Sequence, residues 1–146
     1  MIQELYQQCD SVLSHLGCPE GCSACCGFAP ATEEEYALIQ RFIARHKIIP
    51  VRHPDGETCP LFIDGRCAIY PVRPMICRLY GHTQDLNCPL GRNIQDESAV
   101  RRLMDRYDVL RTSKTRILHE LCWTFAEIAD LPGVTRTNRK AASDGK

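Results

Sequence analysis

The chain has 146 residues, and its 18 Lys and Arg residues balance its 18 Asp and Glu residues, so the formal net charge is zero. This balance argues against a nucleic-acid binder, which needs a basic surface, and against a polybasic membrane module. No uncharged apolar run approaches the roughly 20 residues that a membrane-spanning helix needs. The length predicts one domain, over residues 1–132. The last twelve residues lack core-forming side chains, and residues 133–146 are expected to form a disordered tail.

The N-terminal ten residues contain Glu4 and Asp10 and no Lys or Arg, which is not the charge pattern of a secretory signal peptide. We therefore expect a cytoplasmic protein, in a compartment where thiols stay reduced. Ten residues of the chain are cysteine. In a reducing compartment, so many thiols are more often metal ligands or redox groups than disulfides.

Two amphipathic helices are predicted in the first third of the chain. Residues 2–16 place apolar side chains at steps of three and four, which is one face of a helix. Thr32 and Glu35 have the spacing of a capping box, which predicts a second helix running to about Lys47. The segment 18–30 between them is rich in Cys, Gly and Pro and has no apolar period, so it is expected to be an irregular loop.

Shorter elements follow, and then a long helical pattern. Residues 59–70 predict two short strands around the turn pair Asp64–Gly65, and Pro74 is expected to start a short helix. A helical pattern over residues 95–129 is weakest at residues 112–113, so two helices are the alternative to one. The expected fold class is mainly α: a small single domain of packed helices around an irregular cysteine-rich metal-binding segment with a short β-hairpin.

Eight of the cysteines lie in the predicted loops, hairpin and helix ends. Short gaps between them let one turn of chain present several thiolates to one metal, and such thiolates repel each other unless protons or a metal accompany them. Cys9 and Cys122 lie on predicted apolar helix faces instead and are interpreted as small buried hydrophobic residues. The predicted metal ligands are Cys18, Cys22, Cys25, Cys26, Cys59, Cys67, Cys77 and Cys88.

Two segments resemble a known family. They are CPEGCSACC and CPLFIDGRCAIYPVRPMICRLYG, and the similarity extends over residues 18–88. The family is the YkgJ-type cysteine cluster family, which carries the CxxCxxCC signature and is regarded as a zinc- or iron-chelating domain. The resemblance implies a metal-binding domain whose activity is unassigned in most members. A similar domain occurs in flagellin lysine methylases, which adds a modification-associated role to the redox and metal-handling roles that such a site implies.

The spacing of the cysteines separates the candidate metals poorly, because zinc and iron–sulfur clusters both accept four thiolates. Three cysteines precede proline, as one ligand does in ferredoxins, and one C-x2-C knuckle is present where zinc ribbons pair two. An iron–sulfur cluster, with 4Fe–4S favoured, is therefore expected, and a zinc-binding structural or interaction module without catalysis is the alternative. Arg73 and Arg78 flank Cys77 and are expected to offset the negative charge of the centre. His82 is the histidine closest to the ligand pattern.

An enzyme is a third interpretation, which the sequence leaves open. The spacing Cys18-x3-Cys22-x2-Cys25 equals the cluster signature of radical-SAM enzymes, but that chemistry normally needs a barrel of about 200 residues or more. The chain has no dinucleotide, P-loop, serine-hydrolase or zincin motif. We expect a metal ion or cluster as the ligand, and neither nucleic acid nor membrane as a partner.

Overall fold

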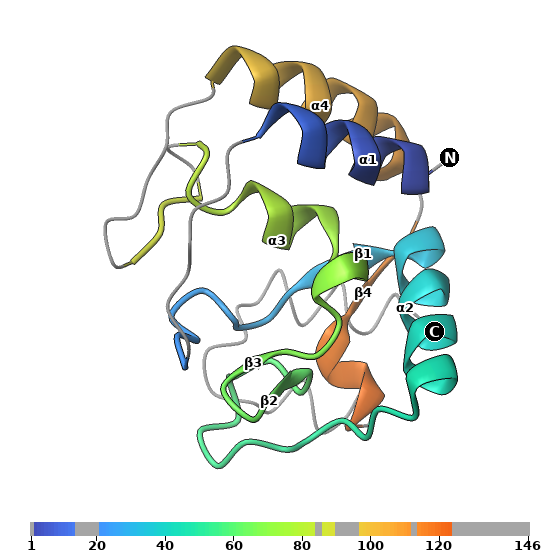
Figure 1. The fold of residues 1–146 in the computed structure, drawn as a ribbon, viewed down its shortest axis with the longest axis vertical. Helices are drawn as coiled ribbons and strands as arrows, with labels where there is room; N and C mark the ends of the chain where they lie inside the picture. Colours follow the sequence, from blue (N-terminus) through green and yellow to red (C-terminus); the bar gives the residue numbers. More distant parts are fainter. Residues whose placement is uncertain (1, 14–20, 84–85, 90–96, 112–113, 124–146) are drawn as a thin grey trace.

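The computed structural model describes residues 2–13, 21–83, 86–89, 97–111 and 114–123 (Figure 1). Within these ranges, two 3-10 helices cover Tyr70–Val72 and Leu118–Leu121. The α-helices are α1 (Ile2–Val12), α2 (Glu33–His46), α3 (Met75–Leu79) and α4 (Glu97–Arg111). Cys18 and the predicted tail over residues 133–146 lie outside the described residues.

Two small antiparallel sheets are present in the described residues, one between distant segments and one within a hairpin. Strand β1 (Pro30–Thr32) pairs with β4 (Thr115–Ile117), and β2 (Phe62–Ile63) pairs with β3 (Arg66–Cys67). The second pair confirms the predicted hairpin. Its turn residues, Asp64 and Gly65, both have positive φ, at 52° and 80°, as a tight two-residue hairpin turn requires.

The helices pack into a core on one side of the β1–β4 sheet. Helices α1 and α4 lie side by side, and α3 lies between them and the strands (Figure 1). Their shared core contains Ile2, Leu5, Tyr6, Cys9, Leu38, Met75, Leu79, Val100, Leu103 and Tyr107. A second core lies where α2 packs against the β1–β4 sheet, and it contains Ala29, Ala31, Tyr36, Ile39, Cys59, Leu61, Ile69 and Leu118. The cysteine-rich segment packs against this second core.

The predicted capping box is confirmed. The backbone N–H of Glu35 donates to Thr32 Oγ1 at 3.2 Å, and that of Thr32 donates to Glu35 Oε2 at 2.9 Å. The Glu35 side chain is 0% exposed, and its Oε1 also accepts from the Tyr6 hydroxyl at 2.9 Å and from the Met75 N–H at 2.7 Å. The Tyr107 hydroxyl donates to Oε2 at 3.3 Å. One carboxylate therefore connects all four α-helices.

The predicted long helix over residues 95–129 is wrong beyond Arg111. Helix α4 ends there, and the chain then forms β4 and a 3-10 helix, while residues 124–129 lie outside the described residues. The change falls between residues 111 and 114, where the helical pattern is weakest. Strand β4 forms because β1 supplies hydrogen-bonding partners from a segment about 85 positions earlier, which the local apolar period cannot reveal.

The short helix expected at Pro74 is confirmed, since Pro74 is the N-cap of α3. The hairpin and the helices expected before residue 95 are thus present in the described residues, the helix expected from residue 95 is present only as far as Arg111, and the β1–β4 sheet is an addition to the expected fold. No helix in the described ranges is both long enough and apolar enough to cross a membrane.

Candidate metal centre

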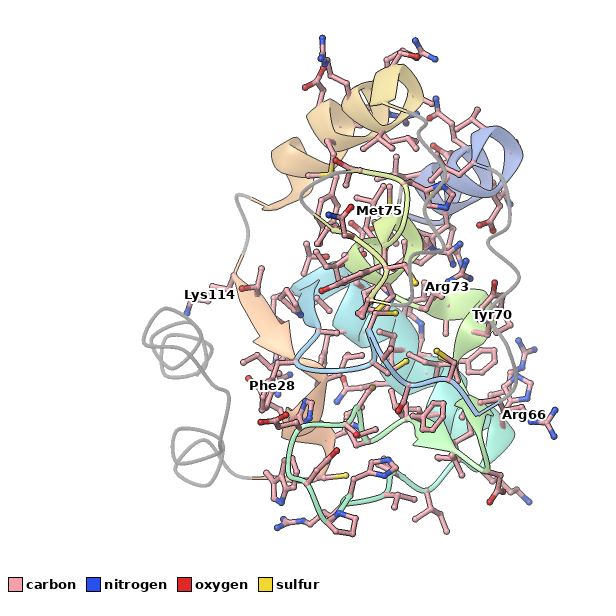
Figure 2. The ribbon with its side chains drawn as sticks, turned by 90° about the vertical axis from the view of Figure 1, so that its left-hand side faces the viewer. Phe28, Arg66, Tyr70, Arg73, Met75 and Lys114 are labelled. Atoms are coloured by element: carbon pink, nitrogen blue, oxygen red, sulfur yellow. The ribbon has the colours of Figure 1, made fainter. Side chains whose placement is uncertain are left out.

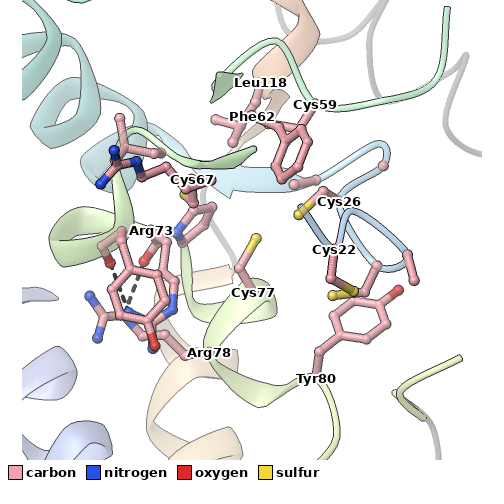
Figure 3. Close-up of a pocket in the computed structure, with 18 of the residues that line it drawn as sticks. Cys22, Cys26, Cys59, Phe62, Cys67, Arg73, Cys77, Arg78, Tyr80 and Leu118 are labelled. Carbon is pink, nitrogen blue, oxygen red and sulfur yellow. Dashed lines mark hydrogen bonds between the residues drawn. The ribbon is translucent and has the colours of Figure 1, made fainter. Parts of the chain in front are cut away.

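Eight cysteines line one cavity of about 840 Å³ (Figure 3). They come from α1, from the loop before β1, from the hairpin region, from α3 and from the loop that follows it. Seven are predicted ligands, and the eighth is Cys9. The lining cysteines are Cys9, Cys22, Cys25, Cys26, Cys59, Cys67, Cys77 and Cys88. All nine cysteines among the described residues are free thiols.

Two glycines hold the first cysteine loop against the hairpin. The N–H of Gly21 donates to Gly65 O at 2.8 Å, and the two residues have φ of 82° and 80°. A Cβ on Gly65 would lie 3.6 Å from Gly21 Cα, in a backbone conformation that other residues rarely adopt. Because Gly21 directly precedes Cys22 and Gly65 lies two residues before Cys67, this contact sets the separation of the two cysteine segments.

Backbone hydrogen bonds also fix the loop that contains Cys25 and Cys26. The N–H of Cys26 donates to Ser23 O at 2.9 Å, and that of Gly27 donates to Cys25 O at 3.1 Å. The carbonyl of Cys26 accepts from the N–H of Cys59 at 2.9 Å. The loop is therefore a tight turn that presents neighbouring thiols, and it is joined directly to the next cysteine along the chain.

Cys77 lies at the centre of the group. It is in the first turn of α3, where its N–H donates to Pro74 O at 3.0 Å, and its side chain points into the cavity between the other labelled cysteines (Figure 3). Desolvation in the cavity wall, together with the nearby Cys59, Cys67 and Cys25, raises the pKa of Cys77 well above its usual value. Cys77 is thus close to thiols of both cysteine segments.

The pKa values of the other thiols indicate that a cation is needed to stabilise several of them as thiolates. Burial raises the pKa of Cys59 to about 12, and it also raises the pKa of Cys67. A hydrogen bond between the side chains of Cys25 and Cys26 lowers the pKa of Cys25 to about 7 and raises that of Cys26. Most of these thiols therefore keep their protons at neutral pH, and a metal must offset the desolvation of several thiolates at once.

The donor set fits a thiophilic metal, but beyond the hydrogen-bonded pair of Cys25 and Cys26 the described thiols are not gathered at one point of the cavity. Within the described ranges, no three Cys, His, Asp or Glu side chains are close enough together to hold one ion. In a tetrahedral zinc site, Zn–S bonds of about 2.3 Å place the sulfurs about 3.8 Å apart. A single ion therefore requires the loops to move inward, whereas a cluster with several iron atoms bridges wider thiol separations.

Arg78 lines the cavity, but its Nε, Nη1 and Nη2 groups form hydrogen bonds with other residues of the protein. It is 3% exposed, and its Nη1 bonds Asp10 of α1 at 2.7 Å. Its Nε and Nη2 donate to Arg73 O at 3.0 Å and Pro71 O at 2.7 Å, and the guanidinium lies 3.9 Å from the centre of the Tyr6 ring. Arg78 therefore fastens α1 to the segment that carries Cys77.

Arg73 is the arginine with the clearer electrostatic effect on the thiols. Its guanidinium lies 3.9 Å above the Tyr70 ring, and Nη1 donates to Tyr70 O at 2.7 Å. Its positive charge partly offsets the effect of burial, which is the larger one, on the pKa of Cys67 and Cys77. This position suits a group that balances negative charge on the sulfurs.

Cys9 and Cys122, the two cysteines that are not predicted ligands, differ in their surroundings. Cys9 is 1% exposed in the α1 core, as expected, but it also lines the cavity, which the apolar helix pattern could not indicate. Cys122 is not on the predicted helix: it follows the 3-10 helix and lies outside the set of described residues that line the cavity. His82 is buried, and both His82 and Tyr80 line the cavity.

Comparison with known protein families gives one match. Residues 17–122, well over half of the chain, match the family "CxxCxxCC: Putative zinc- or iron-chelating domain". The matched range contains the seven predicted ligands that line the cavity, and it begins after Cys9. Neither the curated proteins nor the solved structures contain a match to the chain.

Proposed function

The chain belongs to the CxxCxxCC family, and on that premise we propose that it binds an iron–sulfur cluster, with 4Fe–4S favoured, through cysteine thiolates in the cavity. The observation that carries the proposal is that thiols from segments far apart in the sequence line a single cavity. The ligands proposed first are Cys22, Cys25, Cys26, Cys59, Cys67 and Cys77. Cys18 and Cys88 are the next candidates.

Among the described residues no three thiols are close enough together to hold one ion, and this supports a cluster over a single ion. A cluster places its inorganic sulfides between the irons, so that its cysteine ligands stand farther apart than the ligands of one zinc ion. A zinc-stabilised interaction module is the second candidate. It is favoured by the all-cysteine donor set, which leaves no open coordination position and is typical of structural zinc.

The surrounding residues suit a negatively charged centre. An iron–sulfur cluster supplies one-electron transfer, and its potential depends on nearby charge, hydrogen bonds and solvent access. Arg73 provides positive charge close to Cys67 and Cys77, while Arg78 keeps the α3 segment in place. Thiol ligands persist where the surroundings are reducing, and we propose the cytoplasm as the compartment, with redox, metal-handling or modification-associated chemistry as the task.

Anaerobic purification followed by analysis of iron, acid-labile sulfide and zinc tests the proposal. We expect a brown protein with a broad absorbance near 400 nm and with iron and sulfide in similar amounts. A colourless protein with stoichiometric zinc would replace the cluster by the second candidate. A protein that remains folded and free of both metals under reducing conditions would contradict metal binding altogether.

A further inference from the structure

The cavity is larger than a metal centre alone requires. Its volume of about 840 Å³ is within the range of about 300–1,000 Å³ that is typical of sites for small organic molecules. Its walls also differ in chemistry. Arg73 and Arg78 lie on one side, Cys22 and Cys26 lie on the opposite side, and Cys77 lies between them (Figure 3).

The arginine side of the cavity carries an excess of positive charge. The described residues that line the cavity include Arg66, Arg73 and Arg78 and a single carboxylate, that of Asp10. Asp10 and Arg78 form an ion pair at 2.7 Å, and two backbone carbonyls accept the other Arg78 hydrogen bonds. Arg66 and Arg73 therefore account for the excess, although the chain as a whole is neutral. A cleft with charge of one sign attracts ligands of the opposite sign.

Arg73 is held in a fixed orientation at the opening. The central carbon of its guanidinium lies 3.9 Å above the centre of the Tyr70 ring, and the bond from Nη1 to Tyr70 O uses one of its five N–H donors. Tyr70 is 44% exposed and Arg66 is also exposed, so this end of the cavity is open to solvent. Arg66, Tyr70 and Arg73 lie on the same side of the molecule (Figure 2). A fixed planar guanidinium is suited to bidentate binding of a carboxylate or a phosphate.

We propose that this end of the cavity binds a small anion that carries a carboxylate or phosphate group. Arg73 holds the anionic group through paired N–H donors, Arg66 adds a second positive charge, and the remainder of the ligand extends toward the thiols. Anion binding is a function separate from metal binding, because arginines that only balance the charge of a metal centre do not bind an anion from solution.

Calorimetric titration with inorganic phosphate and with succinate tests the site. Both are titrated at constant ionic strength, under anaerobic reducing conditions, into the metal-loaded and the metal-free chain. We expect saturable binding of at least one anion, and the better one identifies the ligand chemistry. Arg73→Gln is expected to weaken that binding at least tenfold. Arg73→Lys is expected to weaken it as well, because it keeps the charge and loses the paired donors.

The control variant is Arg45→Gln, which removes an exposed arginine on α2 that does not line the cavity. We expect it to bind like the unaltered chain, and we expect Arg66→Gln to weaken binding several-fold. Thermal unfolding of each variant confirms that it is folded. The site is refuted if neither anion binds at millimolar concentration, if a folded Arg73→Lys variant binds both anions as tightly as the unaltered chain, or if Arg45→Gln weakens binding as much as Arg73→Gln.

Metal analysis of the same samples separates this inference from the proposed function. Anion binding through Arg73 in a chain that takes up no metal would contradict the metal site alone. A chain that is fully loaded with metal but binds neither anion would contradict the anion site alone.

Discussion

The backbone N–H of Met75 donates a hydrogen bond of 2.7 Å to Oε1 of Glu35, a residue 40 positions earlier in the chain. Met75 is the first residue of α3, the helix that carries Cys77, and Glu35 lies in the first turn of α2. The same carboxylate accepts from Tyr6 and Tyr107. A buried charge that satisfies four donors holds the central cysteine helix in a defined position relative to the rest of the core.

Glu35→Gln is expected to destabilise the protein by about 2–4 kcal/mol. The amide keeps one acceptor oxygen and turns an NH₂ group toward backbone and hydroxyl donors, and a buried hydrogen bond to a charged group contributes about 1.5–3 kcal/mol. Urea unfolding of the purified protein measures the change. Glu33→Gln, at an exposed position in the first turn of α2, serves as the control, with a change within about 0.5 kcal/mol. Equal midpoints for the two variants would show that Glu35 does not hold the helices together.

Cys77→Ala is expected to abolish most of the metal content, because Cys77 lies near thiols of both cysteine segments. Cys122→Ala should retain full metal content, since Cys122 lies outside the set of described residues that line the cavity. The measurement is the ratio of metal to protein after anaerobic reconstitution. Loss of metal in both variants, or in neither, would contradict the assignment of Cys77 as a central ligand.

The pH dependence of stability is expected to depend on His119. This side chain is fully buried between Phe28 and Trp123, and burial lowers its pKa to about 4 from the usual value of 6.5. Between these pH values the unfolded chain takes up a proton that the folded chain does not, so stability falls as the pH falls from about 6.5 to 4. The loss amounts to about 3 kcal/mol at most, at about 1.4 kcal/mol for each pH unit.

His119→Phe removes the titrating group and keeps an aromatic ring at this position. Urea unfolding at pH 7 and at pH 5 should therefore show a smaller loss of stability in the variant than in the unaltered chain. The exposed His46 at the end of α2 is the matched control, and His46→Gln should retain the original pH dependence. An identical loss in the His119→Phe variant would show that other groups cause it.

Arg78→Ala and Asp10→Asn should differ in their effects, although the two residues form one ion pair. Arg78 is buried and binds two carbonyls as well as Asp10, so its loss leaves buried acceptors without donors and is expected to cost about 3 kcal/mol or more. The Asp10 side chain is 58% exposed, and Asn keeps an amide oxygen that can accept from Arg78 Nη1, so this substitution is expected to cost about 1 kcal/mol or less. Chemical unfolding compares them, and equal losses would contradict the buried role of Arg78.

Local sequence patterns were sufficient for the elements whose determinants are close together in the chain. The Thr32–Glu35 capping box, the Asp64–Gly65 hairpin and the start of α3 at Pro74 each depend on neighbouring residues, so their spacing alone predicted them. The choice of cysteine as the donor also follows from the sequence, because few residue types bind soft metals and these occur at loop spacing.

The remaining features depend on contacts between distant segments. Strand β4 needs β1 as its hydrogen-bonding partner. Cys9 reaches the cavity only because α1 is paired with the α3 segment through Asp10 and Arg78. The four donors to Glu35 come from four different elements. The spacing of apolar residues indicates which face of a helix is buried, but it does not indicate which other element packs against that face. The sequence by itself therefore determines that cysteine thiolates are the metal donors of this protein. The shared cavity, with its arginine side and its cysteine side, is decided by tertiary packing.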